Sequence, residues 1–143
     1  MNQTQGNSET EQGKFFDLHV TGIGYLNRVR EVEVKRGKPF LAVDIAALHG
    51  NADSVQHTRF DCRVSGKEAQ ALIRELAPAV EADRKVLVGF KLGDLYAELF
   101  TYQQGERQGQ TGVSLKARLL KITWAKIDGE PVTLPTTGED PTV

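Results

Sequence analysis

Apolar and polar residues alternate over long parts of the chain, which is the pattern of strands with one buried face. The first such run, residues 15–34, is rich in β-branched and aromatic residues, and Gly22 and Gly24 interrupt its alternation. Glycines within a strand favour a bulge or a sharp bend, and a bend lets a long first strand turn the corner of a small closed barrel. Two further alternating runs, residues 40–50 and 59–65, predict the second and third strands.

One segment, residues 66–82, has the period of a helix instead. Its apolar residues recur at spacings typical of one helical stripe: Ala69, Leu72, Ile73, Leu76 and Val80. Ser65 is the expected N-cap with Glu68 as its capping-box partner, and Pro78 is expected to end or kink the last turn. A single apolar stripe ordinarily packs on a core, so we expect this helix to contribute stability.

Strand-like alternation returns after the helix. Residues 84–93 and 94–102 follow one another directly, residues 103–110 form a polar hairpin loop, and residues 111–127 form the last long strand. The predicted order is therefore β-β-β-α-β-β. Five strands with one helix between the third and the fourth is the order of the OB-fold, a five-stranded Greek-key barrel. The sequence predicts an all-β fold with one helix, which closes an end of the barrel.

The length and composition predict one domain with two tails. Residues 1–13 contain no large apolar residue after Met1 and are expected to be disordered, while residues 131–143 hold three of the five prolines and are expected to be flexible. The OB-fold domain is expected to span residues 14–130. We expect no signal peptide and no membrane span, because no long apolar run exists. The single cysteine, Cys62, excludes an intrachain disulfide and fits the cytoplasm.

The net charge of −1 hides an asymmetry between the domain and its ends. All 18 basic residues lie within residues 14–130, whereas four of the 19 acidic residues lie outside them. The domain therefore carries a mild positive excess, which permits binding to a polyanion without demanding it.

The middle of the chain, "TRFDCRVSGKEAQALIRELAPAVEADRKVLVGFKLGDLYAELF", has an aromatic strand, a polar turn, an alanine-rich helix, a following strand and a long hairpin. In this order it resembles bacterial single-stranded DNA-binding proteins, with Lys85, Val86, Val88 and Gly89 in equivalent roles. Two features depart from that pattern. The chain has one tryptophan, Trp124, which lies late in the last strand. Its C-terminal tail is short and only weakly resembles the acidic tail with an apolar end that those proteins have.

A second resemblance covers nearly the whole chain from Phe15 to Glu130. The stretches that carry it are "FDLHVTGIGYLNRVREV", "PFLAVDIAALHG", "TRFDCRVSG", "KVLVGFKLGDLY" and "GQTGVSLKARLL". They resemble a family of small proteins of unknown function, labelled conjugative-element replication proteins, that integrative and conjugative elements encode. The resemblance implies a role in replication or transfer of such an element. It also implies a homodimer or homotetramer formed through strand pairing.

In an OB-fold the ligand site is the face of strands two and three with the loops that join strands one to two and four to five. Cations and aromatic residues, the groups that hold single strands, are available there. The candidate nucleic-acid-binding residues are Arg28, Arg30, Lys35, Arg36, Lys38, Arg59, Phe60, Arg63, Tyr96, Phe100, Tyr102, Arg107, Lys116 and Arg118. Several cations stand two residues apart, which places them on one strand face.

Other interpretations of these residues stay open at this stage. Cations at alternate strand positions are also typical of a solvated sheet face. Phe60 alternates with Cys62 and Val64, so it is as readily a core residue as a stacking one. Asp44 and Asp61 on the candidate faces count against a dense phosphate track.

Enzymatic and metal chemistry have little support in the sequence. His49, Asp53 and His57 form the only cluster that resembles metal-ligand spacing, and it lies in a polar loop without cysteines or an H-E-x-x-H helix. Cys62 alternates into the predicted core and is expected to be a small buried hydrophobe. We therefore expect no enzyme, no metal and no cofactor.

The sequence thus favours a single-stranded DNA-binding protein of a mobile element, with little sequence preference. The alternative is an OB-fold interaction module of a conjugation or replication complex that binds other proteins and no nucleic acid. The mild charge and the scarcity of tryptophan favour the alternative, and the several cation pairs beside an aromatic hairpin favour the first hypothesis.

Overall fold

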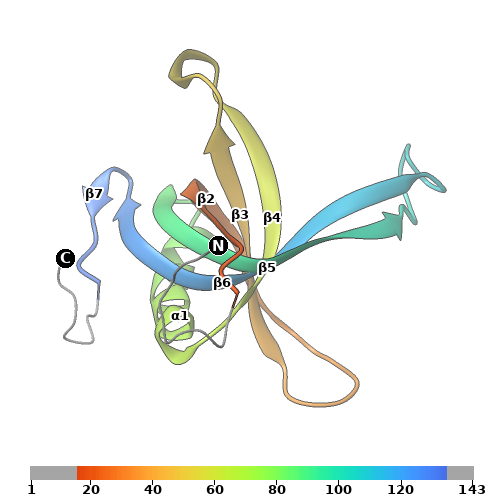
Figure 1. Cartoon of the computed structure of the whole chain (residues 1–143), viewed down its shortest axis with the longest axis horizontal. Helices are drawn as coiled ribbons and strands as arrows, with labels where there is room; N and C mark the ends of the chain where they lie inside the picture. Colours follow the sequence, from red (N-terminus) through yellow and green to blue (C-terminus); the bar gives the residue numbers. More distant parts are fainter. Residues whose placement is uncertain (1–15, 135–143) are drawn as a thin grey trace, which may run out of the picture.

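The computed structural model describes residues 16–134, which form a closed five-stranded barrel with one helix (Figure 1). The barrel strands are β2 (His19–Val32), β3 (Phe40–His49), β4 (Gln56–Val64), β5 (Val86–Thr101) and β6 (Thr111–Ile127). Helix α1 (Lys67–Glu81) lies between β4 and β5, a short 3₁₀ turn η2 (Ala52–Ser54) lies between β3 and β4, and the two-residue β7 (Glu130–Pro131) follows β6. The predicted order of five strands and one helix is confirmed.

The barrel closes through one parallel strand pair. Antiparallel neighbours run in the order β4-β3-β2-β5-β6, and β6 then pairs with β4 in parallel, from Phe60 opposite Leu115 to Val64 opposite Leu119. Because both edges of the sheet meet there, neither β4 nor β6 leaves an unpaired edge along this stretch. This topology is that of an OB-fold-like barrel.

Alternate residues of every strand fill the barrel. The largest fully buried side chains include Ile45, Leu92 and Leu119 from three different strands. Helix α1 packs on this core through the predicted stripe, of which Leu72, Ile73 and Leu76 are buried. Its contribution is apolar packing, in agreement with the expectation from its period.

The ends of α1 differ from the sequence-based expectation. The N-cap is Gly66, which has a φ of 91° and no capping side chain, so the expected cap at Ser65 with its partner Glu68 is wrong. The helix also continues three residues beyond Pro78 to Glu81 without ending there. A proline removes one hydrogen bond, and near the end of a helix the surrounding turns tolerate that loss.

The irregularity of β2 lies later in the strand than its glycines suggest. Gly22 and Gly24 pair in regular register with β5, whereas the register shift falls between Asn27 and Arg30. Arg28 at that shift has a φ of 50°, the left-handed region that single bulge residues occupy. Gly24 serves close packing instead, since a Cβ there would lie 2.7 Å from the backbone oxygen of Ala46.

The described structure extends past the expected boundary at residue 130. The N–H of Val132 donates to the carbonyl of Ala125 at 2.9 Å, and Val132 and Leu134 pack against the core. The expected tail at residues 1–13 and the remainder of the second tail, residues 135–143, lie outside the described residues.

The β3–β4 hairpin, the β5–β6 hairpin and the connection between β2 and β3 extend beyond the barrel in different directions (Figure 1). Residues 84–102, which were expected as two consecutive strand segments, contain the single 16-residue strand β5. The outer half of β5 pairs with β6 out to Thr101 opposite Thr111, so it carries its side chains away from the core. The long strands therefore both close the barrel and build an arm.

Candidate nucleic-acid interface

The outward side chains of β2, β3, β4, β5 and β6 line a groove of about 520 Å³ on the barrel wall. Strand pairing explains the assembly, because Asp61 lies opposite Lys116 and Arg63 lies opposite Arg118. Their neighbours on each strand point inward, as alternation requires. Five predicted residues line this groove: Arg30, Arg63, Tyr96, Lys116 and Arg118.

Asp61 is the centre of an ion-pair cluster in the groove. Its two carboxylate oxygens accept hydrogen bonds from Arg30 Nη2 and Lys116 Nζ, each at 2.7 Å. Partial burial raises the pKa of Asp61, but the hydrogen bonds and charges of Lys116 and Arg30 outweigh it, and the pKa ends below its usual value. The hydrogen bond to Asp61 raises the pKa of Lys116 despite some desolvation. Asp61 and Lys116 are thus both charged at neutral pH.

A second acid, Asp44, lies beneath three arginines on the same wall. Its side chain is only 2% exposed and accepts from Arg28 Nε at 2.8 Å and from Arg30 Nη1 at 3.1 Å, while Arg59 Nη1 lies 3.9 Å away. The hydrogen bond to Asp44 raises the pKa of Arg28. Because a buried carboxylate requires such partners, these arginines stabilise the barrel wall as well as charging its surface.

The groove also has two cations that are not paired with Asp44 or Asp61. The Arg63 guanidinium lies 4.3 Å from the ring centroid of Phe40, and the described residues place no carboxylate within 4.0 Å of it. Arg118 Nε lies 2.9 Å from an oxygen of the exposed Asp94. An exposed pair of this kind is worth at most about 1 kcal/mol, so a phosphate can compete for Arg118.

The candidate aromatic residues divide into core and surface. Phe60 is 8% exposed and belongs to the core, so the structure excludes the base-stacking interpretation in favour of the core alternative. Tyr96 is 56% exposed and lies in the groove beside Lys116. Farther along the β5–β6 arm, Phe100 and Tyr102 meet edge to face with ring centroids 4.9 Å apart.

The remaining candidates lie outside the groove. Arg107 near the tip of the β5–β6 hairpin donates to the hydroxyl of Tyr102 at 3.2 Å, which ties it to the arm. Three cations lie exposed on the β2–β3 loop: Lys35, Arg36 and Lys38. Arg28 and Arg59 lie over Asp44. The predicted set therefore occupies the groove, the barrel wall over Asp44, the β2–β3 loop, the β5–β6 arm and, for Phe60, the core.

Sequence reasoning missed two contributors to the charge of the groove: Asp94 pairs with Arg118, and Glu98 pairs with Lys116. The Arg63 guanidinium also lies over the ring of Phe40. Phe40 and Ala42 stand two residues apart on β3, and both line the groove. The acids gave no signal, because their partners are distant in sequence.

Comparison with known proteins gives one match, a family model that covers residues 9–139. The chain belongs to the DUF3577 family, which is described as a protein family of unknown function. The expectation of a family of unknown function is therefore confirmed. No curated protein and no solved structure is significantly similar to the chain.

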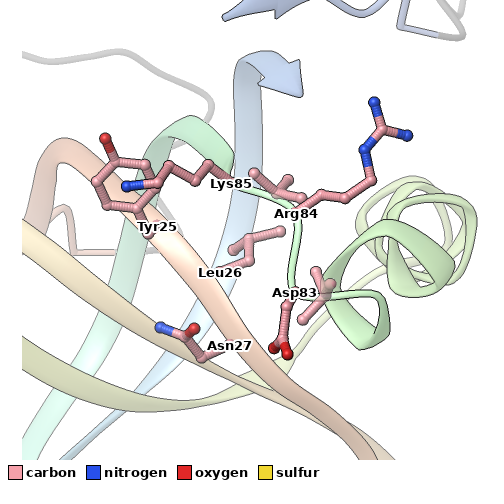
Figure 2. Close-up of a pocket in the computed structure, with 8 residues that line it drawn as sticks. Tyr25, Leu26, Asn27, Asp83, Arg84 and Lys85 are labelled. Atoms are coloured by element: carbon pink, nitrogen blue, oxygen red, sulfur yellow. The ribbon is translucent and has the colours of Figure 1, made fainter. Parts of the chain in front are cut away.

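A second, smaller pocket of about 180 Å³ lies beside the middle of β2, between that strand and the segment that follows α1. Figure 2 shows that Tyr25, Leu26 and Asn27 come from β2, while Asp83, Arg84 and Lys85 come from the segment after α1. Its lining has cationic, acidic and aromatic groups but no cysteine or histidine.

Other chemistry in the described residues is limited. Burial raises the pKa of the Cys62 thiol to about 12, which keeps it protonated. His49 Nε2 lies 2.9 Å from the Thr58 hydroxyl, and residues 16–134 hold no group of three His, Cys, Asp or Glu side chains suited to a metal ion. No helix in that range is long and apolar enough to cross a membrane.

Proposed function

We propose that this protein binds single-stranded DNA with little sequence preference and without catalysis, through the groove on its barrel wall. The observation that carries the proposal is the side-by-side placement of Arg63 and Arg118 next to the exposed ring of Tyr96. Two cations on neighbouring strands attract phosphates, and an exposed ring offers a surface on which a base stacks.

The groups of the groove have distinct roles in this proposal. Arg63 and Arg118 bind successive phosphates, because in residues 16–134 Arg63 has no carboxylate partner and Arg118 has only the exposed Asp94 and a hydrogen bond of 3.3 Å to the Ser65 hydroxyl. Arg30 and Lys116 are shared between Asp61 and the incoming phosphate. Tyr96 stacks on a base, a contact worth about 1–3 kcal/mol. Phe100 and Tyr102 extend the aromatic path along the arm.

The resemblance to proteins of integrative and conjugative elements supports a role in the replication or transfer of such an element. Both processes expose single strands that require protection. The partners in that setting are single-stranded DNA and proteins of the replication or conjugation machinery.

A second candidate is a protein-interaction module that uses the same barrel without nucleic acid. Leu99 and Val113, an exposed cross-strand pair on the β5–β6 arm, are 69% and 60% exposed. Such an apolar pair on a projecting arm is a contact that a partner protein would bury. The ion pairs of Asp44 and Asp61, which neutralise much of the groove, also favour this candidate.

Fluorescence anisotropy of labelled oligo-dT tests the proposal. We expect binding at low salt and a steep fall in affinity as the salt concentration rises. For a single strand, each phosphate contact contributes about −0.7 to the slope of the logarithm of the binding constant against the logarithm of the salt concentration. The double variant Arg63→Ala/Arg118→Ala should bind more weakly, with a slope shallower by about 1.4. Lys67→Ala, on the exposed first turn of α1, is the matched control.

Two outcomes would reject the proposal. Wild-type protein that binds no oligo-dT at low salt and micromolar concentration has no single-strand function. A double variant that binds as well as the wild type shows that the groove is not the site. Recovery of element-encoded proteins in a pull-down after nuclease treatment, together with absent DNA binding, would select the second candidate.

A further inference from the structure

The barrel has a second outward face, separate from the groove, on the other halves of β2, β5 and β6. Strand pairing aligns its residues in three rows across the strands. The rows are Ile23–Gly89–Trp124, Tyr25–Leu87–Lys126 and Thr21–Lys91–Lys121. We call this surface the Trp124 face. Its neighbours along each strand, such as Val88 and Phe90, point into the core.

The lysines of the Trp124 face oppose one another. Lys91 of β5 lies directly opposite Lys121 of β6, an arrangement that destabilises a sheet unless an anion lies between the two. Lys126 adds a third positive charge one row away. Within the part of the chain that the structure describes, no carboxylate forms an ion pair with any of these lysines. The groove differs in this respect, because Asp44 and Asp61 form ion pairs with its cations.

Trp124 lies in the middle of these charges. A Cβ on Gly89 would fall 2.4 Å from Trp124 Nε1, so the indole occupies the space that any other side chain would fill. Lys126 Nζ lies 5.8 Å from the ring centroid, and the exposed Ile23 lies in the same row as Trp124. Gly89 thus permits a large aromatic group to lie against the sheet beside three cations.

We propose that the Trp124 face binds a second segment of the same single strand of DNA that occupies the groove. The phosphates lie between Lys91 and Lys121, and a base packs against Trp124. This inference rests on the proposed function, since it extends the path of a strand already bound. A single strand presents the two groups that the face lacks: negative charges at regular intervals and flat apolar rings.

The two sites are continuous along β6. Arg118 of the groove and Lys121 of the Trp124 face are three residues apart, about 10 Å at the rise of a strand. A strand leaving the groove beside Arg118 therefore reaches Lys121 within a few nucleotides.

A second copy of the chain is a poorer occupant of this face. Two copies joined face to face about a two-fold axis would bring the lysine cluster of one against the lysine cluster of the other. Like charges brought together in an interface oppose association. Charge complementarity favours the polyanion.

The test uses the full chain and a labelled oligo-dT of about 16 nucleotides, the upper range for one OB-fold. Anisotropy of the label reports all binding, while emission excited at a wavelength that tyrosine does not absorb reports Trp124 alone, because the chain has one tryptophan. We expect emission to be quenched in parallel with the anisotropy rise. The variant Lys91→Gln/Lys121→Gln should weaken binding several-fold and reduce the salt slope by about 1.4. Lys67→Gln is the control.

The variant removes a repulsion, so its melting temperature should not fall, which separates lost binding from lost folding. An anisotropy rise with unchanged Trp124 emission and an unchanged slope in the variant would overturn this inference and leave the groove intact. No anisotropy rise would overturn the inference together with the proposed function. Light scattering that shows a wild-type dimer, with Trp124 emission dependent on protein concentration, would assign the face to a second copy and overturn the inference.

Discussion

Replacing Asp61 with asparagine should strengthen DNA binding while weakening the fold. Asp61 holds Arg30 and Lys116 at 2.7 Å each, and asparagine keeps its size but removes its charge. Arg30 retains Asp44 at 3.1 Å and Lys116 retains Glu98 at 3.5 Å, so neither cation is left without a partner. Both become more available to phosphates.

The expected size of each effect follows from the contacts. Hydrogen bonds to charged groups contribute about 1.5–3 kcal/mol when buried, and exposed ion pairs contribute about 0–1 kcal/mol. The side chain of Asp61 is 24% exposed, so we expect a loss of about 1–2 kcal/mol in the free energy of unfolding. A domain with a typical stability of about 5–15 kcal/mol stays folded after that loss. Two released cations should steepen the salt slope of binding by about 1.4.

Urea unfolding and oligo-dT anisotropy at several salt concentrations measure both effects. Asp128→Asn is the matched control, because Asp128 also pairs with an arginine, Arg84 at 2.8 Å, but lies away from the groove. The control should leave DNA binding unchanged. A folded Asp61→Asn protein with weaker binding, or with an unchanged salt slope, would refute the idea that Asp61 competes with phosphate.

The same substitution has a defined pH dependence. The pKa of Asp61 is lower in the folded protein than its unfolded value near 3.9. Its stabilisation is therefore complete above the unfolded pKa and is lost as pH falls through the folded pKa. The stability difference between wild type and Asp61→Asn should be constant near neutral pH and should narrow below about pH 4. A difference that persists in acid would contradict the charge-based account.

Two further predictions concern the core and its outer wall. Cys62, whose thiol pKa burial raises to about 12, should not react with a thiol reagent at pH 8 until urea unfolds the barrel, and rapid labelling of the native protein would contradict its burial. Gly89→Ala places a methyl group 2.4 Å from Trp124 Nε1, so it should displace the indole, shift its emission and destabilise the protein by about 1–3 kcal/mol, as overpacking does. Unchanged emission and melting temperature would show that Trp124 does not lie over Gly89.

The strand order and the helix could be predicted because they depend on local patterns. The stripe that contains Leu72, Ile73 and Leu76 is periodic, and the alternation in residues 59–65 separates inward from outward side chains without knowledge of the fold. The same alternation left Phe60 with two interpretations. Only the closed barrel, in which β4 pairs with β6, decides that Phe60 faces the core.

The charges of the groove could not be predicted in the same way. Arg28 and Arg30 formed a pair of cations on one strand, which suggested a phosphate track. Their main partner, Asp44, stands on the next strand, and Asp61 stands one strand farther. Which acid meets which base depends on strand register, and a register shift at Arg28 decides it here. The sequence shows which acids are present, but it does not show how far each acid lies from each base.

The parallel pairing of β6 with β4 also determines how the molecule behaves when its chain is cut. Strand β6 is hydrogen-bonded to β5 along one edge and to β4 along the other, and β7 and Val132 add contacts at its end. A protease cut in the polar loop at residues 103–110 would therefore sever the backbone without removing the last strand from the barrel. The two fragments would remain associated after the cut. That loop is therefore the natural point at which to divide this protein into complementing fragments.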